Sequence, residues 1–101
     1  MEAGSAPLVL INAFEVPEGR EEEFIRGWEG TRDYVRTQPG YVDTALHQAV
    51  SPDPDFRFVN VGRWETPEAF QHAIQSPGFR EASAALAEFR PHPALYRVVR
   101  T

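Results

Sequence analysis

The chain has no cysteine, no lysine and no long apolar run. Without cysteine, disulfides, thiolate nucleophiles and cysteine-ligated metal sites are all excluded. No apolar segment approaches the length that crosses a bilayer, and the first seven residues lack the charged and apolar regions of a signal peptide. We therefore expect a cytoplasmic protein with no membrane partner.

Positive charge is also scarce. Ten basic residues, all arginine, face 15 acidic ones, for a formal net charge of −5. Nucleic acids and acidic membrane surfaces select basic patches, so neither is expected as a partner. The three histidines, His47, His72 and His92, have no metal-ligand spacing, and neither a glycine-rich phosphate loop nor a serine-triad signature is present. We expect no metal site.

The periodicity of apolar residues predicts one α+β domain with the element order β-α-β-β-α-β. Strands are expected over residues 8–16, 41–50, 56–64 and 94–100, and helices over 20–37 and from Thr66 onward. This order is typical of a ferredoxin-like fold, in which a four-stranded antiparallel sheet carries both helices on one face. The domain spans residues 8–101 and follows a flexible N-terminus, residues 1–7.

Local signals set several boundaries. Thr66-Pro67 predicts a helix start, and Ser76-Pro77 repeats that signal, so the second helix is expected to break and restart. Residues 89–93, with two prolines, are expected to be irregular. Simple alternation places Tyr41 on the same strand face as Asp43 and His47.

The expected third strand carries the most informative pattern. Phe56, Phe58, Asn60, Gly62 and Trp64 are two residues apart and share one face. A plain core strand has no need of an amide there, so Asn60 indicates a polar spot in an apolar site. An alternative interpretation is that Asn60 satisfies backbone groups and Trp64 fills the core.

The opposite sheet face is apolar in the first and third strands, at Val9, Ile11, Val59 and Val61. No residues remain to cover it. A second copy of the chain is the simplest partner that could bury this apolar face, so we expect a homodimer.

With these elements in place, the chain resembles the antibiotic biosynthesis monooxygenase (ABM) family of dimeric α+β barrel proteins. The resemblance rests on LINAFEVPEGREEEFIRGW, QPGYVDTALHQA and FRFVNVGRWETPEAFQHAIQSPGF, and it covers nearly all of residues 8–100. It implies that two sheets face each other across a dimer and that each protomer keeps a pocket between its sheet and its helices.

The resemblance also implies site residues. Cofactor-free oxygenases of this family have an Asn and a Trp four apart on the third strand, matched by Asn60 and Trp64, which are the expected catalytic residues. They also use a Tyr six residues after that Trp, where this chain has Phe70, and an arginine matched only by Arg80, out of register. The expected substrate-binding residues are Asn12, Phe58, Phe70, Phe24, Trp28 and Arg80.

A haem-degrading branch of the family shares the first-strand amide, matched by Asn12. Its helix Trp falls where this chain has Ala73, and its haem-ligating His falls where this chain has Ser83. This departure argues against haem breakdown.

The resemblance therefore implies a small cofactor-independent monooxygenase that uses O2 to turn an aromatic, polyketide-like phenol or anthrone into a quinone, without metal or flavin. Asn60 can donate its amide to a substrate oxygen, and Trp64 offers an indole N–H and a stacking surface. Two alternatives stay open: a non-redox cyclase or isomerase with the same pocket, and a binding protein for an apolar or haem-like ligand.

Overall fold

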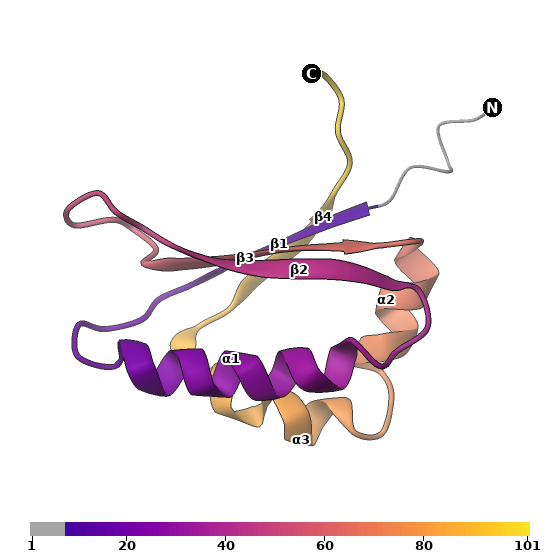
Figure 1. Cartoon of the computed structure of the whole chain (residues 1–101), viewed down its shortest axis with the longest axis horizontal. Helices are drawn as coiled ribbons and strands as arrows, with labels where there is room; N and C mark the ends of the chain where they lie inside the picture. The colour runs from indigo at the N-terminus through magenta and orange to yellow at the C-terminus, as the bar shows by residue number, and fades with distance from the viewer. Residues whose placement is uncertain (1–7) are drawn as a thin grey trace.

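The computed structural model describes residues 8–101, so the expected flexible N-terminus lies outside the described residues. Its elements are, in order, β1 (Leu8–Phe14), α1 (Glu21–Val35), β2 (Tyr41–Gln48), β3 (Phe58–Trp64), α2 (Pro67–Ile74), α3 (Phe79–Ser83), the 3-10 helix η2 (Ala84–Phe89) and β4 (His92–Tyr96). The sheet order is β2-β3-β1-β4, and every neighbouring pair is antiparallel. The helices all lie on one face of this sheet (Figure 1). The ferredoxin-like prediction is confirmed.

The first helix and the strand after it are joined by a turn that requires glycine. Gly40 has a φ of 87°, and a Cβ there would lie 2.4 Å from the Cβ of Ala69. Both the left-handed backbone and the close approach exclude a side chain. Gly40 therefore holds the start of β2 against α2, next to the end of β3.

The second helical region is built in two pieces, as predicted. Thr66 caps α2 by accepting a hydrogen bond from the backbone N–H of Ala69 at 3.0 Å, and Pro67 is the first helical residue. The helix stops before Ser76, whose hydroxyl lies 2.5 Å from the Tyr34 hydroxyl of α1. The chain then restarts as α3 and η2, so two short helices cover one side of the sheet.

The last strand differs from the prediction. It covers His92–Tyr96 and not residues 94–100. The expectation that 89–93 is irregular was wrong for Phe89, which ends η2, and for His92 and Pro93, which begin β4. Pro93 is tolerated because β4 is an edge strand, where a missing N–H costs no ladder bond on the outer side. Pairing ends at Tyr96 because its partner Val9 is almost the first residue of β1.

Tyr41 also lies on a different face from the predicted one. The pairing of β2 with β3 shifts by one residue between Tyr41 and Asp43. Such a bulge reverses the alternation, so Tyr41 and Thr44 both face the helices while Asp43 and His47 face the other side. The bulge is the reason that a phenol reaches the helix-covered face.

An aromatic core fills one end of the space between sheet and helices. Phe24 of α1 is fully buried, and its ring centroid lies 4.8 Å from that of Phe14, 4.9 Å from that of Phe58 and 5.2 Å from that of Phe89. Each ring contributes about 1.5–3 kcal/mol by burial. This cluster stands at the Phe14 and Phe58 end of β1 and β3 and leaves the Trp64 end free for a cavity.

The other sheet face carries no helix (Figure 1). Val9, Val61 and Ala45 form a shallow apolar surface there, beside an ion pair between Arg63 and Asp43. The Arg63 guanidinium holds the pKa of the Asp43 carboxyl below its usual value. Among the described helices, none is both long and apolar enough to cross a membrane.

Candidate functional site

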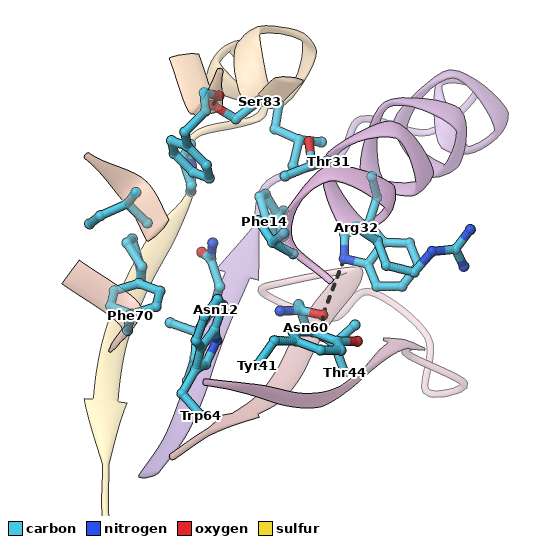
Figure 2. Close-up of a pocket in the computed structure, with 18 of the residues that line it drawn as sticks. Asn12, Phe14, Thr31, Arg32, Tyr41, Thr44, Asn60, Trp64, Phe70 and Ser83 are labelled. Atoms are coloured by element: carbon cyan, nitrogen blue, oxygen red, sulfur yellow. Dashed lines mark hydrogen bonds between the residues drawn. The ribbon is translucent and has the colours of Figure 1, made fainter. Parts of the chain in front are cut away.

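A cavity of about 300 Å³ lies between the sheet and the helices. This volume is at the lower end of the range of small-molecule sites, roughly 300–1,000 Å³. Figure 2 shows its walls, with Asn12, Asn60 and Trp64 on the sheet side and Phe70 and Ser83 on the side of the broken helix. The other lining residues are mostly apolar, and they are Leu10, Phe14, Trp28, Thr31, Arg32, Val35, Tyr41, Thr44, Ile74, Phe79, Leu86, Ala87, Pro91 and Pro93.

The structure brings five of the predicted site residues to this cavity: Asn12, Trp28, Asn60, Trp64 and Phe70. It does not bring the other three. Phe24 and Phe58 belong to the aromatic core, with 0% and 1% of their surface exposed, and they support the site from behind. Arg80 is exposed on α3 and does not line the cavity, because its neighbour Phe79 takes the inward position.

Two amides face each other across β1 and β3, since Asn12 and Asn60 are register partners. The Asn60 Oδ1 accepts two hydrogen bonds, from the Trp28 indole Nε1 at 3.1 Å and from the Thr44 hydroxyl at 2.6 Å. Its NH2 group has no protein partner within residues 8–101, although the residue is only 8% exposed. A buried amide with a free donor is suited to a ligand oxygen.

Asn12 repeats this arrangement. Its Oδ1 accepts the backbone N–H of His92 on β4 at 2.9 Å, and among the described residues its NH2 group has no acceptor. Both amides therefore use their oxygens on the protein and keep their N–H groups for a ligand. The sheet therefore presents two neutral N–H donors, the amides of Asn12 and Asn60, to an apolar cavity.

Trp64 forms the end wall of the cavity, with 3% of its surface exposed. Tyr41 and Phe70 pack edge-on against its indole from two sides, each with ring centroids 5.7 Å from it. In the part of the chain that the structure describes, no acceptor bonds its indole N–H. Trp64 is thus a fixed aromatic surface with an available donor.

Tyr41 is a lining residue that the sequence analysis missed, because no residue signal revealed the bulge in β2. Burial raises the pKa of the Tyr41 phenol above its ordinary value, and the nearby Asp43 carboxylate adds to the rise. The phenol therefore stays protonated near neutral pH. It serves the cavity as an O–H donor, not as a base.

Thr44, Thr31, Ser83 and Arg32 were also missed. The Thr31 hydroxyl donates to the Ala82 carbonyl at 2.8 Å and so links α1 to α3, whereas the Ser83 hydroxyl donates to the Phe79 carbonyl at 2.8 Å within α3 itself. The Arg32 guanidinium carbon lies 5.3 Å from the centroid of the Trp28 ring. Figure 2 shows the guanidinium extending away from Asn12.

The cavity lining contains no carboxylate, imidazole or thiol. Among residues 8–101, no group of three or more His, Cys, Asp or Glu side chains could hold a metal ion. Apart from Arg32, whose guanidinium extends away from Asn12, the polar groups of the lining are uncharged donors around an apolar space. Such an arrangement can stabilise an oxygen that carries negative charge, and it offers no side-chain base.

Residues 7–85 match the model of the family described as antibiotic biosynthesis monooxygenase. The chain belongs to the ABM family. A solved ABM-type structure is that of SnoaB, a cofactor-independent oxygenase from Streptomyces nogalater, with a TM-score of 0.81 and 28% identity over 94% of this chain and 95% of that one. A Shewanella loihica PV-4 structure reaches a TM-score of 0.84 and 40% identity over 96% and 98% of the two chains.

Two enzymes with different substrates are similar to this ABM protein in sequence. Deoxynogalonate monooxygenase of Streptomyces nogalater is 32% identical over 78% of this chain and 64% of its own length. The mycobilin-producing heme oxygenase of Mycobacterium tuberculosis is 34% identical over 86% of this chain and 77% of its own length. The prediction of the family from the sequence is confirmed, and its relatives include oxygenases of both kinds.

Proposed function

We propose that this ABM protein is a small cofactor-independent monooxygenase that oxidises an aromatic phenol or anthrone to a quinone in secondary-metabolite biosynthesis. The observation that carries the proposal is the pair of free amide donors, Asn12 and Asn60, beside Trp64 in an apolar cavity. The oxygenase relatives from Streptomyces nogalater support it. O2 and the aromatic compound are the two substrates.

The ring system of the substrate fits among Trp64, Phe70 and Phe79, and its phenol or enol oxygen lies at the amides. Donation from the two NH2 groups stabilises the oxyanion and so lowers the pKa of the bound substrate. No lining side chain accepts the proton, so it leaves to water. The electron-rich anion is then the reductant of the reaction.

The reaction needs no other electron source. The carbanion form of the substrate gives electrons to O2, and a C–O bond forms to give a peroxide at that carbon. Loss of water across the O–O bond leaves the carbonyl, so that CH2 and O2 become C=O and H2O. Trp64 and the protonated Tyr41 phenol provide N–H and O–H donors for the peroxide oxygen.

Purified protein treated with chelator, then incubated with 1,8-dihydroxyanthrone under oxygen, tests the proposal. We expect quinone formation and O2 uptake in a one-to-one ratio, well above the rate of spontaneous oxidation in buffer. The Asn60→Ala variant controls for surface-promoted oxidation and should fall to background. Equal rates with and without the protein would refute the proposal for anthrones.

A non-redox cyclase or isomerase is the second candidate. Phe70 favours it, because this position lacks the phenol that the oxygenase pattern carries. The discriminating readout is product formation under anaerobic conditions, because an oxygenase forms no product without O2. In that case the amide pair would stabilise an enolate and no oxygen would react.

Haem or a haem-like ligand is the third candidate, and it rests on the 34% identity to a heme oxygenase. Ser83 stands where the resemblance expects the iron-ligating histidine, and the cavity lining contains no imidazole. We expect no Soret shift on titration with haem. A ligand-bound Soret band would move this candidate to first place.

We also propose that the protein is a homodimer. Its uncovered sheet face presents Val9, Ile11, Val59 and Val61 on the side away from the helices, where no described residue covers them. Burying this face against a second copy removes the apolar surface from water. The two cavities then lie on opposite sides of the paired sheets.

A further inference from the structure

Three elements meet at one oxygen atom. Trp28 of α1 and Thr44 of β2 both donate to the Oδ1 of Asn60 on β3, at 3.1 and 2.6 Å (Figure 2 draws the bond from the indole). The sequence separations are 32 and 16 residues. The Trp28 contact joins a helix to the sheet, and the Thr44 contact crosses from β2 to its paired strand β3 on the helix-covered face. Both side chains are therefore placed by the tertiary fold.

The chemistry of the donors identifies the amide atom that they contact. An indole N–H donates and has no acceptor, so the atom facing Trp28 is the carbonyl oxygen of Asn60. The Thr44 hydroxyl uses the second acceptor position of that oxygen. If the amide flipped, its NH2 group would face the indole donor and a buried oxygen would face the apolar cavity.

The indole is itself held in place. Its ring is partly buried against the aromatic core, and the Arg32 guanidinium carbon lies 5.3 Å from its centroid on the outer side. Thr44 is fixed by its pairing opposite Gly62, where a Cβ would lie 3.1 Å from the Thr44 hydroxyl oxygen. The absent side chain at Gly62 thus leaves room for the hydroxyl that reaches Asn60.

We propose that Trp28 and Thr44 are positioning residues that lock the Asn60 amide with its NH2 group toward the cavity. The lock makes the site selective for ligands that present an acceptor oxygen, such as a phenolate or quinone carbonyl. The substrate class rests on the proposed function, whereas the orientation of the amide does not.

The two tryptophans of the chain allow a direct test by NMR, because only two indole N–H signals exist. The Trp64→Phe variant assigns them. We expect the Trp28 signal to be shifted downfield and slow to exchange, and to lose both properties in Asn60→Ala. A Trp28 signal that is the same in both proteins would overturn the proposal.

Binding tests the selectivity without catalysis. The probes are 1,4-naphthoquinone, whose carbonyls only accept hydrogen bonds, and naphthalene, which has the same rings without oxygen. The quinone is a safe probe because the chain has no cysteine or lysine to add to it. We expect the native protein to prefer the quinone, and Thr44→Val and Trp28→Phe each to reduce that preference about threefold to tenfold.

Thr44→Ser keeps the hydroxyl and should keep the preference, and unchanged naphthalene affinity shows that each variant still folds around its cavity. Equal affinity of the native protein for both probes, or an unchanged preference in Thr44→Val and Trp28→Phe, overturns the proposal. Anthrone oxidation is scored separately. If the Thr44→Val and Trp28→Phe variants lose the quinone preference but the native protein oxidises no anthrone, the positioning role is supported and the oxygenase is refuted. If the variants keep the preference and the native protein oxidises anthrone, only the positioning role is refuted.

Discussion

Asn12 and Asn60 lie opposite each other on adjacent strands, and each has its Oδ1 bound by a donor from a third element. The pair is therefore a matched set of N–H donors, although asparagine can equally well accept. Cross-strand neighbours lie about 4.5–5.5 Å apart at Cβ, close enough for both amides to reach one ligand oxygen.

Replacing the Asn60 NH2 group with an oxygen atom should abolish the activity and leave the protein folded. In Asn60→Asp, Trp28 and Thr44 still have an acceptor, but the cavity gains a negative charge where the substrate oxyanion lies. Loss of an oxyanion donor costs about 10²–10³-fold in kcat. We expect at least that loss in kcat/KM for 1,8-dihydroxyanthrone, with a native circular dichroism spectrum. Activity within tenfold of the native value would contradict the proposed role.

The pH profile should follow the substrate. The cavity lining contains no carboxylate or imidazole, and the raised pKa of the Tyr41 phenol keeps that group protonated near neutral pH. Log kcat/KM should therefore rise with pH until the substrate is ionised. A phenol of lower pKa should move the inflection down by a similar amount. The same inflection for two phenols of different pKa would reveal a protein base.

Tyr41 should supply the hydroxyl that Phe70 lacks, since both rings flank Trp64. Tyr41→Phe removes one hydrogen bond to the reacting oxygen and should lower kcat about tenfold. Adding Phe70→Tyr in that background should recover much of the loss, because the new phenol packs against the other side of the indole. If Tyr41→Phe reacts at the native rate, the hydroxyl plays no part.

Two glycines offer a matched stability test. Gly40→Ala combines a left-handed backbone with a clash against Ala69, and should destabilise the fold by about 3 kcal/mol. Gly30→Ala lies in α1 with no atom within 4 Å of the new Cβ, and should stabilise by about 0.5–1 kcal/mol. Urea unfolding measures both. Equal effects would mean that the contact of Gly40 with α2 is not formed.

The uncovered sheet face should control assembly. Val61→Glu places a charge in the proposed interface and should convert a dimer to a monomer in light scattering coupled to size exclusion. Val50→Glu, at a fully exposed site in the β2–β3 loop, is the control and should leave the dimer intact. A native protein that is monomeric at micromolar concentration would refute the dimer.

Much of the fold could be predicted because its signals are local. Alternation defined β1 and β3, Thr66-Pro67 began α2, and Ser76-Pro77 divided the second helix. The face shared by Asn60 and Trp64 followed from the same alternation. These features depend on neighbouring residues and on the strand period alone.

The rest depended on contacts that the sequence does not encode locally. The bulge that turns Tyr41 inward arises from pairing with β3, and the extent of β4 depends on the length of β1. Spacing could not separate the core aromatics, such as Phe24, from cavity aromatics, because both lie on the same faces. Thr44 was missed for a similar reason, since only its tertiary contact with Asn60 gives it a role.

The division of the second helix has a consequence for how such a protein diversifies. Phe70 and Ile74 come from α2, Phe79 and Ser83 come from α3, and the break at Ser76 lies between them. Exchanges on either short helix can therefore enlarge or narrow the chamber independently, while the amides on the sheet stay where they are. The same pair of amide donors can in this way accommodate ligands of many shapes.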